Sequence, residues 1–285
     1  MSHDPFTQSR SRIRFEWGPA GAQAIGPGAA IVAVVDVLSF TTALTVAADR
    51  GIEVFPYRWR DERATGFAAA HRATLAVGRS QAGPATPVSL SPATIRAATG
   101  VERLVLPSPN GSTIARLLAE QGATVIGVSL RNARAAAAWT ARAIRMSPAA
   151  RESPNNLAGT AERAVRTTWA AGAEGATVAV VAAGERWAAD GSLRPAVEDM
   201  WGAGAFLAAL ADEGVPGASP ETLTAAAAYR AVAADISSAL RDCASGRELI
   251  TGGYPEDVEV AAERDSSTVV PLLDGERFRP VPAQP

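Results

Sequence analysis

An aspartate, Asp36, stands directly after the apolar run 30–35 and before a segment with helical spacing. A carboxylate in this position can hold a hard cation, and it can also act as the nucleophile of a phosphatase. A third alternative is structural, because Asp36 or the nearby Ser39 could cap the helix that follows. The sequence around Asp36 leaves these three roles open.

A second polar segment, 107–113, connects an apolar run to another helical pattern. Gly111 can adopt a positive φ, and Asn110 and Ser112 add polar side chains beside the first N–H groups of the helix. Such an arrangement suits a phosphate or another anion. Asn-Gly pairs are also common in ordinary turns, so a simple turn is the alternative.

Three arginines follow apolar runs in the same way, at Arg79, Arg131 and Arg186. The chain contains no lysine, which excludes Schiff-base chemistry and a Walker-type phosphate lysine. A bound phosphate would have to be held by arginine, backbone N–H groups, hydroxyls or a metal ion. Asn132, directly after Arg131, could instead be a helix cap.

Three further carboxylates lie in the second half of the chain. Glu185 stands in a Gly-Glu-Arg turn after the run 177–182, and Glu198 and Asp199 open a helical segment. All three could bind a cation. Acidic residues are also expected in a first helical turn because they complement the helix dipole.

The elements that must position these residues follow from hydrophobic periodicity. Apolar runs rich in branched residues predict strands at 30–35, 52–56, 74–77, 103–106, 124–128, 177–182 and 266–271. Helical spacing predicts helices at 39–50, 61–72, 112–121, 132–146, 157–171, 197–213, 220–234 and 237–247. Alternation of strands and helices predicts an α/β fold, a three-layer α/β/α sandwich with a mostly parallel or mixed sheet. Ligands of such folds collect in loops at the carboxyl ends of strands.

Length and composition bound the class of protein. The 285 residues are 47% hydrophobic, and the formal net charge is −2. We expect a single α/β domain over 1–285, with a two-lobe division near 146–157 as the alternative and flexible ends at 1–12 and 280–285. The charge gives no basic surface for nucleic acid, and no apolar stretch predicts a membrane segment. The single cysteine fits a cytoplasmic setting, and a homodimer is the default assembly.

The order of these loops along the chain resembles the 2-phosphosulfolactate phosphatase family of coenzyme M biosynthesis. The resemblance extends from about residue 30 to about residue 272. It rests on Asp36-Val37-Leu38, Gly78-Arg79, Ser91-Pro92, Asn110-Gly111-Ser112, Ser129-Leu130-Arg131-Asn132, Ala183-Gly184, Val197-Glu198-Asp199 with 202–204, and a late 245–249 segment followed by Gly253 and Asp257.

The resemblance implies a Mg²⁺-dependent phosphoric monoester hydrolase that converts 2-phosphosulfolactate to sulfolactate and phosphate. Its partner is a small anionic phosphorylated substrate. It implies a magnesium ion held by Asp36, Glu185, Glu198 and Asp199. It implies a catalytic set of Asp36, Arg79, Asn110, Arg131 and Arg186, and a phosphate-binding set of Gly111, Ser112 and Asn132. Either water or Asp36 could be the nucleophile.

The sequence departs from the family pattern at several positions. Ser39 and Leu90 replace an arginine and an asparagine, and the glutamate of a Gly-Glu-Arg turn is missing before Arg79. Pro-Ser-Pro at 107–109 replaces a threonine run. Loss of an arginine and a carboxylate would weaken transition-state stabilisation if both touched the phosphate. Two alternatives are therefore a catalytically weakened relative that binds a small anion, and another phospho-transfer enzyme on the same scaffold.

Overall fold

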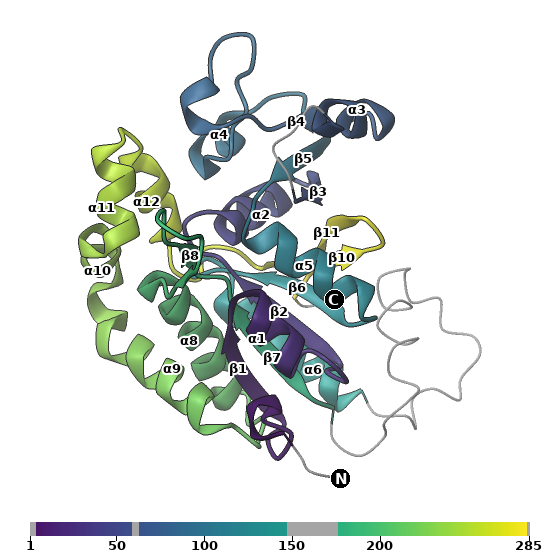
Figure 1. The fold of residues 1–285 in the computed structure, drawn as a ribbon, viewed down its shortest axis with the longest axis vertical. Helices are drawn as coiled ribbons and strands as arrows, with labels where there is room; N and C mark the ends of the chain where they lie inside the picture. The colour runs from purple at the N-terminus through teal and green to yellow at the C-terminus, as the bar shows by residue number, and fades with distance from the viewer. Residues whose placement is uncertain (1–3, 59–62, 147–175, 284–285) are drawn as a thin grey trace.

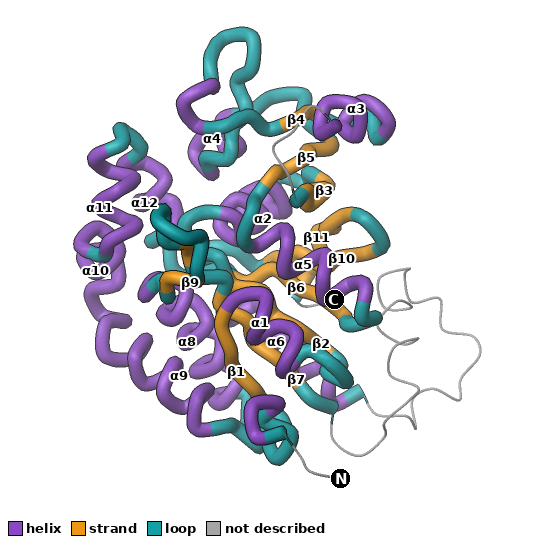
Figure 2. Tube along the Cα trace, viewed as in Figure 1, coloured by secondary structure: helices purple, strands orange, loops and turns teal. Residues whose placement is uncertain are grey.

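The computed structural model describes residues 4–58, 63–146 and 176–283. In these residues a nine-stranded mixed sheet has helices on both faces, which confirms the α/β prediction (Figures 1 and 2). The strand order is β1-β7-β2-β6-β10-β11-β3-β5-β4. The strands are β1 (Ile13–Trp17), β2 (Ile31–Val35), β3 (Glu53–Tyr57), β4 (Thr74–Leu75), β5 (Arg103–Pro107), β6 (Thr124–Val128), β7 (Val178–Ala182), β10 (Val269–Asp274) and β11 (Arg277–Pro282).

The sheet consists of two parallel sets joined by a hairpin. Strands β1, β7, β2 and β6 form one set, and β3, β5 and β4 form the other. The β10–β11 hairpin lies between the two sets: β10 pairs antiparallel with β6, and β11 pairs antiparallel with β3. Because β10 and β11 are themselves antiparallel, the strands of the two sets run in opposite directions when the sheet is drawn flat. Twist of roughly 20–25° per strand step accumulates to about 100–125° over the five steps from β2 to β5. With this ordinary twist, strands β2 and β5 would cross at an angle instead of opposing each other directly.

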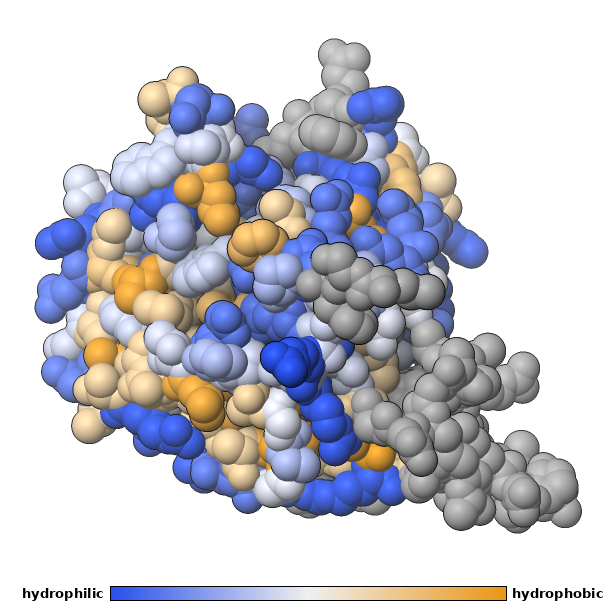
Figure 3. Space-filling view, turned by 60° about the horizontal axis from the view of Figure 1, so that its bottom comes forward, coloured by the Kyte–Doolittle hydropathy of each residue, from blue (hydrophilic) through white to orange (hydrophobic). Residues whose placement is uncertain are grey.

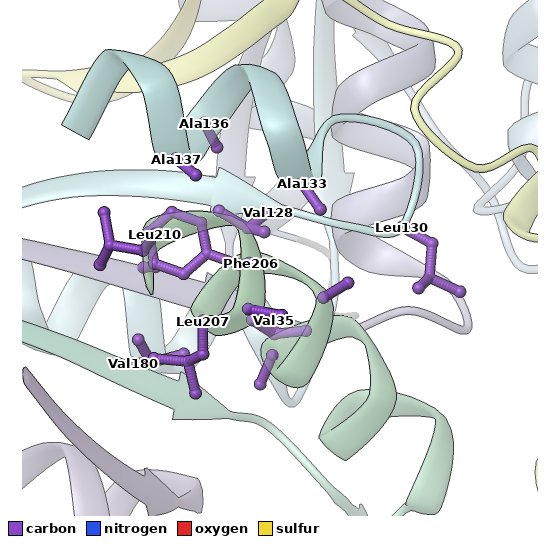
Figure 4. Packing of buried hydrophobic residues seen from close by; sticks show 14 of the residues in the cluster. Val35, Val128, Leu130, Ala133, Ala136, Ala137, Val180, Phe206, Leu207 and Leu210 are labelled. Atoms are coloured by element: carbon purple, nitrogen blue, oxygen red, sulfur yellow. The ribbon is translucent and has the colours of Figure 1, made fainter. Parts of the chain in front are cut away.

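Alternating residues of the central strands fill two separate cores. In β2, Ile31, Ala33 and Val35 belong to one buried cluster, and Val32 and Val34 belong to the other. This period of two is what a sheet covered on both faces requires. The first cluster contains residues of α6 (Ala133–Arg145), α8 (Val197–Asp212) and α9 (Pro220–Val232), and the second contains residues of α1 (Gly18–Ile25), α2 (Phe40–Asp49) and α5 (Gly111–Glu120). Figure 4 shows Val35 and Val180 beside Phe206 and Leu207 of α8.

Helix α8 approaches the sheet closely because it carries a glycine at Gly202. A Cβ on Gly202 would lie 2.5 Å from Val37 Cγ2 and 2.9 Å from Val35 Cγ1. Gly202 thus permits the close packing of α8 on the sheet, whereas Gly204 permits close packing on α9, where a Cβ would lie 2.1 Å from Ala225 O. The contact at Gly202 places the second turn of α8 against the end of β2.

Several elements differ from the sequence-based expectations. Strand β1, helix α1 and the short helix α4 (Pro92–Ala97) were not predicted, and residues 280–282, expected in a frayed tail, lie in β11. The predicted helix 237–247 is two helices, α10 (Ile236–Asp242) and α11 (Ala244–Thr251). They separate at Cys243, whose backbone is extended and whose Sγ accepts a hydrogen bond from Gly246 N. The predicted helix 157–171 and the predicted division near 146–157 fall outside the described residues, apart from residue 146.

Three further elements belong to the fold. They are α3 (Arg63–Ala70), α12 (Pro255–Ala261) and a small antiparallel hairpin of β8 (Glu185–Arg186) and β9 (Leu193–Arg194). Helix α3 packs on strands β3, β4 and β5. On the face in Figure 3, hydrophobic and hydrophilic residues are interspersed over the described surface, as is ordinary for globular proteins. Among the helices of the described ranges, none combines the length and the apolar character needed to span a membrane.

Candidate functional site

A pocket of about 130 Å³ opens where the loops after β2, β5 and β7 meet. Its lining combines two carboxylates, a guanidinium, an amide and hydroxyl groups with a few apolar side chains. The lining residues are Asp36, Leu38, Ser39, Phe40, Arg79, Leu90, Leu106, Ser108, Pro109, Asn110 and Glu185. The size suits a single small group such as a phosphoryl group and its immediate neighbours.

Asp36 lines this pocket and is only 6% exposed. Its Oδ1 accepts a hydrogen bond from Phe40 N at 3.1 Å, so it caps α2 as one alternative predicted. Its Oδ2 accepts a hydrogen bond from Gly111 N at 3.0 Å, at the start of α5. The Ser39 hydroxyl instead donates to the carbonyl of Leu90. Asp36 is thus held by two helix N-termini, and each of its oxygens keeps a lone pair for a ligand.

This arrangement requires a glycine at position 111 because no room is left for a side chain, and not because of the backbone φ of Gly111. A Cβ at this position would lie 2.3 Å from Phe40 Cδ1 and 2.8 Å from Asp36 Oδ2. Gly111 is also not among the residues with positive φ. The sequence-based reason for this glycine, a left-handed turn, is therefore wrong, and close helix approach replaces it.

Glu185 is the second carboxylate of the pocket. It is half-buried, and its Oε2 accepts a hydrogen bond from Asn110 Nδ2 at 3.0 Å. Asn110 therefore orients a carboxylate instead of capping its own helix, since its side chain makes no cap bond. This amide joins the loop after β5 to the loop after β7.

Both pocket carboxylates bind protons more readily than usual. Burial raises the pKa of Asp36 to about 6, against the lowering effect of the Phe40 and Gly111 N–H groups. Burial raises the pKa of Glu185 to about 7, with further contributions from the negative charges of Asp36 and Glu198. The shared cause is a concentration of negative charge in a place with little water. A cation or a proton would relieve it.

Glu198 and Asp199 lie behind the pocket, at 2% and 3% exposure, in the first turn of α8. Asp199 Oδ1 accepts from Val37 N at 2.7 Å, and its Oδ2 accepts from Gly184 N at 2.8 Å. Asp199 thus holds the loops after β2 and β7 together. Burial, followed by the charges of Asp36 and Glu198, raises its pKa well above the usual range. The buried Cys243 thiol is next to Glu198, and burial together with this neighbour raises its pKa to about 12.

The four predicted metal ligands do not form one ligand cluster. Within the described ranges, no three side chains of His, Cys, Asp and Glu are arranged to hold a metal ion. Only Asp36 and Glu185 line the pocket. Magnesium typically uses one or two carboxylates, with waters and substrate oxygens in its other positions, and a pair of carboxylates fits that pattern. The pocket is therefore compatible with a substrate-completed Mg²⁺ site and not with an all-protein cage.

Arg79 supplies the cationic side of the pocket, from the 3₁₀ helix Arg79–Gln81. Its Nε donates to Asp257 Oδ2 at 2.7 Å. Its Nη2 is buried and has no hydrogen-bond partner in the described structure. An unsatisfied N–H on a charged group is costly, and an anion in the pocket could satisfy it.

The other predicted clamps lie away from the pocket lining. Arg131 is buried at 5% exposure and pairs with Asp49 at 2.9 Å and with Glu263. Arg186 is exposed, and its Nη1 donates to the Gly191 carbonyl. These arginines therefore have structural contacts where the sequence predicted substrate contacts.

Two predicted phosphate-binding residues are also engaged inside the protein. Asn132 accepts from Ser129 N and donates to the carbonyls of Gly127 and Val269, and it makes no helix-cap bond. The Ser112 hydroxyl donates to the Leu106 carbonyl. Neither residue lines the pocket.

Sequence reasoning missed part of the lining. Ser39, Leu90, Ser108 and Pro109 line the pocket. The sequence marked them as departures from a family pattern, and Ser39 also as a possible helix cap, but not as site residues. Asp257, which binds Arg79, was noted only as part of a late motif. No spacing signal connects Asp257 to Arg79, because 178 residues separate them.

One comparison with known proteins bears on this site. Residues 149–276 match the family model described as 2-phosphosulpholactate phosphatase. The match confirms the resemblance to this phosphatase family over that part of the chain, which includes Glu185, Glu198, Asp199 and Asp257. The loops that carry Asp36, Arg79 and Asn110 lie before the matched residues.

Proposed function

We propose that the chain hydrolyses a small phosphate monoester, with 2-phosphosulfolactate as the first candidate substrate. The observation that carries this proposal is the composition of one small pocket. Asp36 and Glu185 provide negative charge there, and Arg79 provides an unpaired buried N–H group. The family match over residues 149–276 supports the same reaction class.

The phosphoryl group would lie between Arg79 and the two carboxylates. Arg79 would bind a phosphoryl oxygen and stabilise the charge that develops during transfer. Asp36 and Glu185 would hold a magnesium ion, which supplies charge neutralisation at the phosphoryl oxygens when it is bound. Asn110 would keep Glu185 oriented through their 3.0 Å hydrogen bond.

Asp36 could either bind the cation or attack phosphorus as the nucleophile, and its fixed orientation suits both roles. Its two oxygens are fixed by Phe40 N and Gly111 N, so its orientation is set before a ligand enters. Such fixation suits a carboxylate that binds a cation, and it equally suits one that attacks phosphorus directly. Trapping a phosphorylated aspartate with the substrate would distinguish these two routes.

A second candidate is a relative that binds a small anion without turnover. The observation that favours it is that four of the positions that depart from the family pattern, Ser39, Leu90, Ser108 and Pro109, line the pocket. Residues that differ from the family pattern and line the ligand pocket would change which substrate binds or reduce the rate of catalysis. A different phospho-transfer reaction would be a third outcome on the same scaffold.

The test is release of inorganic phosphate from a panel of small phosphate esters that includes 2-phosphosulfolactate. Each ester would be assayed with Mg²⁺ and with EDTA. Turnover that EDTA abolishes supports the phosphatase and ranks its substrates. Binding of the esters by calorimetry without turnover would instead support the anion-binding relative. A product formed without free phosphate would indicate another phospho-transfer reaction.

A further inference from the structure

Asp257 is a buried carboxylate that the proposed hydrolysis does not use directly. It lies in the first turn of α12 and is 1% exposed. Its Oδ1 accepts from the Ser91 hydroxyl and from Ala93 N, both at the start of α4, and its Oδ2 accepts from Arg79 Nε. Asp257 therefore ties α12, α4 and the Arg79 loop together at one edge of the pocket.

The nitrogens of the Arg79 guanidinium differ in their hydrogen bonding. Asp257 engages Nε, and Nη2 remains buried without a partner. The Tyr254 ring lies against the guanidinium at 5.8 Å from its centroid. A guanidinium held through one edge and packed on an aromatic ring presents its remaining donors in a fixed direction.

The pocket contains other carboxylates that compete with Asp257 for the Arg79 guanidinium. Asp36 and Glu185 line the same pocket, and the charge of Arg79 already acts on Asp36. A guanidinium released from Asp257 would be drawn to these carboxylates, because opposite charges in a poorly solvated pocket attract strongly. Such an ion pair would occupy the space and the donors that an anionic ligand needs.

We infer that Asp257 is a positioning residue that holds Arg79 away from Asp36 and Glu185, so that its free N–H groups face an anionic ligand. The inference rests on the proposed function, since it concerns the anion of the same pocket. It assigns Asp257 a role in ligand affinity that acts through Arg79. It also explains why a half-buried cation and two carboxylates coexist in the pocket without a direct hydrogen bond between them in the described structure.

The test is a double-mutant cycle on binding of inorganic phosphate, measured by titration calorimetry in one buffer that contains Mg²⁺. Asp257→Asn is suited to the cycle because Oδ1 keeps its contacts with Ser91 and Ala93, while Nδ2 would face Arg79 Nε donor to donor. We expect about tenfold weaker phosphate binding, the loss of one charge-assisted contact. In an Arg79→Met background the same substitution should leave phosphate affinity unchanged.

Glu259→Gln is the matched control, because Glu259 is an exposed residue of α12 whose two oxygens bind Arg241 at 2.8 Å. It removes an ion pair from the same helix without reaching the pocket, so phosphate affinity should stay at the wild-type value. Equal losses from Asp257→Asn with and without Arg79, or no loss in either background, would overturn the inference. Wild-type protein that neither binds phosphate nor releases it from any ester would refute the proposed function itself.

Discussion

The backbone N–H of Gly111 donates to Oδ2 of Asp36 at 3.0 Å, although the two residues lie 75 positions apart. This bond joins the loop after β2 to the start of α5. Asn110, next to Gly111, continues the connection to Glu185. The pocket thus depends on the contact between two helix N-termini, and disturbing that contact should affect both stability and ligand binding.

The first prediction concerns Gly111→Ala. The added methyl group would lie 2.3 Å from Phe40 Cδ1, so α5 must move away from Asp36. We expect a loss of about 1–3 kcal/mol in the free energy of unfolding, as for other overpacked sites, together with reduced turnover. Denaturant unfolding and the phosphate-release assay would measure the two effects.

Gly66→Ala is the matched control for this substitution. Gly66 lies in α3, and a Cβ there meets nothing within 4 Å. It should stabilise the protein slightly, because alanine favours a helix over glycine. Wild-type stability and turnover in Gly111→Ala would contradict the packing described for this pocket.

The second prediction concerns the two arginines at Arg79 and Arg131. Arg131→Met should remove the ion pairs that the buried Arg131 makes with the partly exposed Asp49 and Glu263, and it should cost roughly 1–3 kcal/mol of stability. The KM of the folded protein should be unchanged, because Arg131 does not line the pocket. Arg79→Met should instead weaken substrate binding, and it should also reduce stability because it leaves the buried Asp257 without its ion-pair partner. A raised KM in Arg131→Met would support the sequence-based role of Arg131 as an anion clamp.

The third prediction is a pH dependence of stability. The pKa values of about 6 for Asp36 and about 7 for Glu185 in the folded protein exceed the ordinary values of 3.8 and 4.5 for these side chains. Between the ordinary pKa and the folded pKa of each group, the folded protein therefore binds more protons than the unfolded chain. The free energy of unfolding consequently falls as pH rises from about 4 to about 7. Asp36→Asn and Glu185→Gln should each flatten this fall. Urea unfolding across the pH range would measure it, and an unchanged slope in both variants would contradict the prediction.

The fourth prediction is a pH dependence of stabilisation by Mg²⁺. A protonated carboxylate does not bind a cation, so the increase in melting temperature caused by Mg²⁺ should be larger at pH 8 than at about pH 5.5. Glu185→Gln should reduce the increase at pH 8. Matched ionic strength with NaCl controls for general salt effects. Equal stabilisation by NaCl and MgCl₂ at pH 8 would argue against a magnesium site.

The central strands were predictable because their sequences are runs of branched residues bounded by glycine or proline. Strand β2 is fully buried on both faces, and its two sets of alternating side chains each meet a helical layer. Strand β1 was not predictable in this way. It lies at the edge of the sheet, and it alternates Arg14 and Glu16 with its apolar residues. In β11, two prolines and two arginines conceal the strand pattern.

The site was predictable where a polar residue directly follows a strand. Asp36, Arg79, Asn110 and Glu185 were each selected on that ground, and the structure brings them to one pocket. Arg131 has the same local sequence features, and its partners Asp49 and Glu263 lie 82 and 132 residues away. A single sequence contains no signal for such contacts. It could not separate a buried structural arginine from one that faces a ligand.

The most direct test of the proposed phosphatase is the rate of phosphate release from 2-phosphosulfolactate by wild-type protein and by Asp36→Asn. We expect Mg²⁺-dependent turnover by the wild type and a loss of at least about 100-fold in the variant, the effect of removing an essential catalytic group. Glu120→Gln, an exposed carboxylate outside the pocket lining, should keep wild-type turnover. Undiminished turnover in Asp36→Asn, or no turnover by folded wild-type protein, would contradict the account.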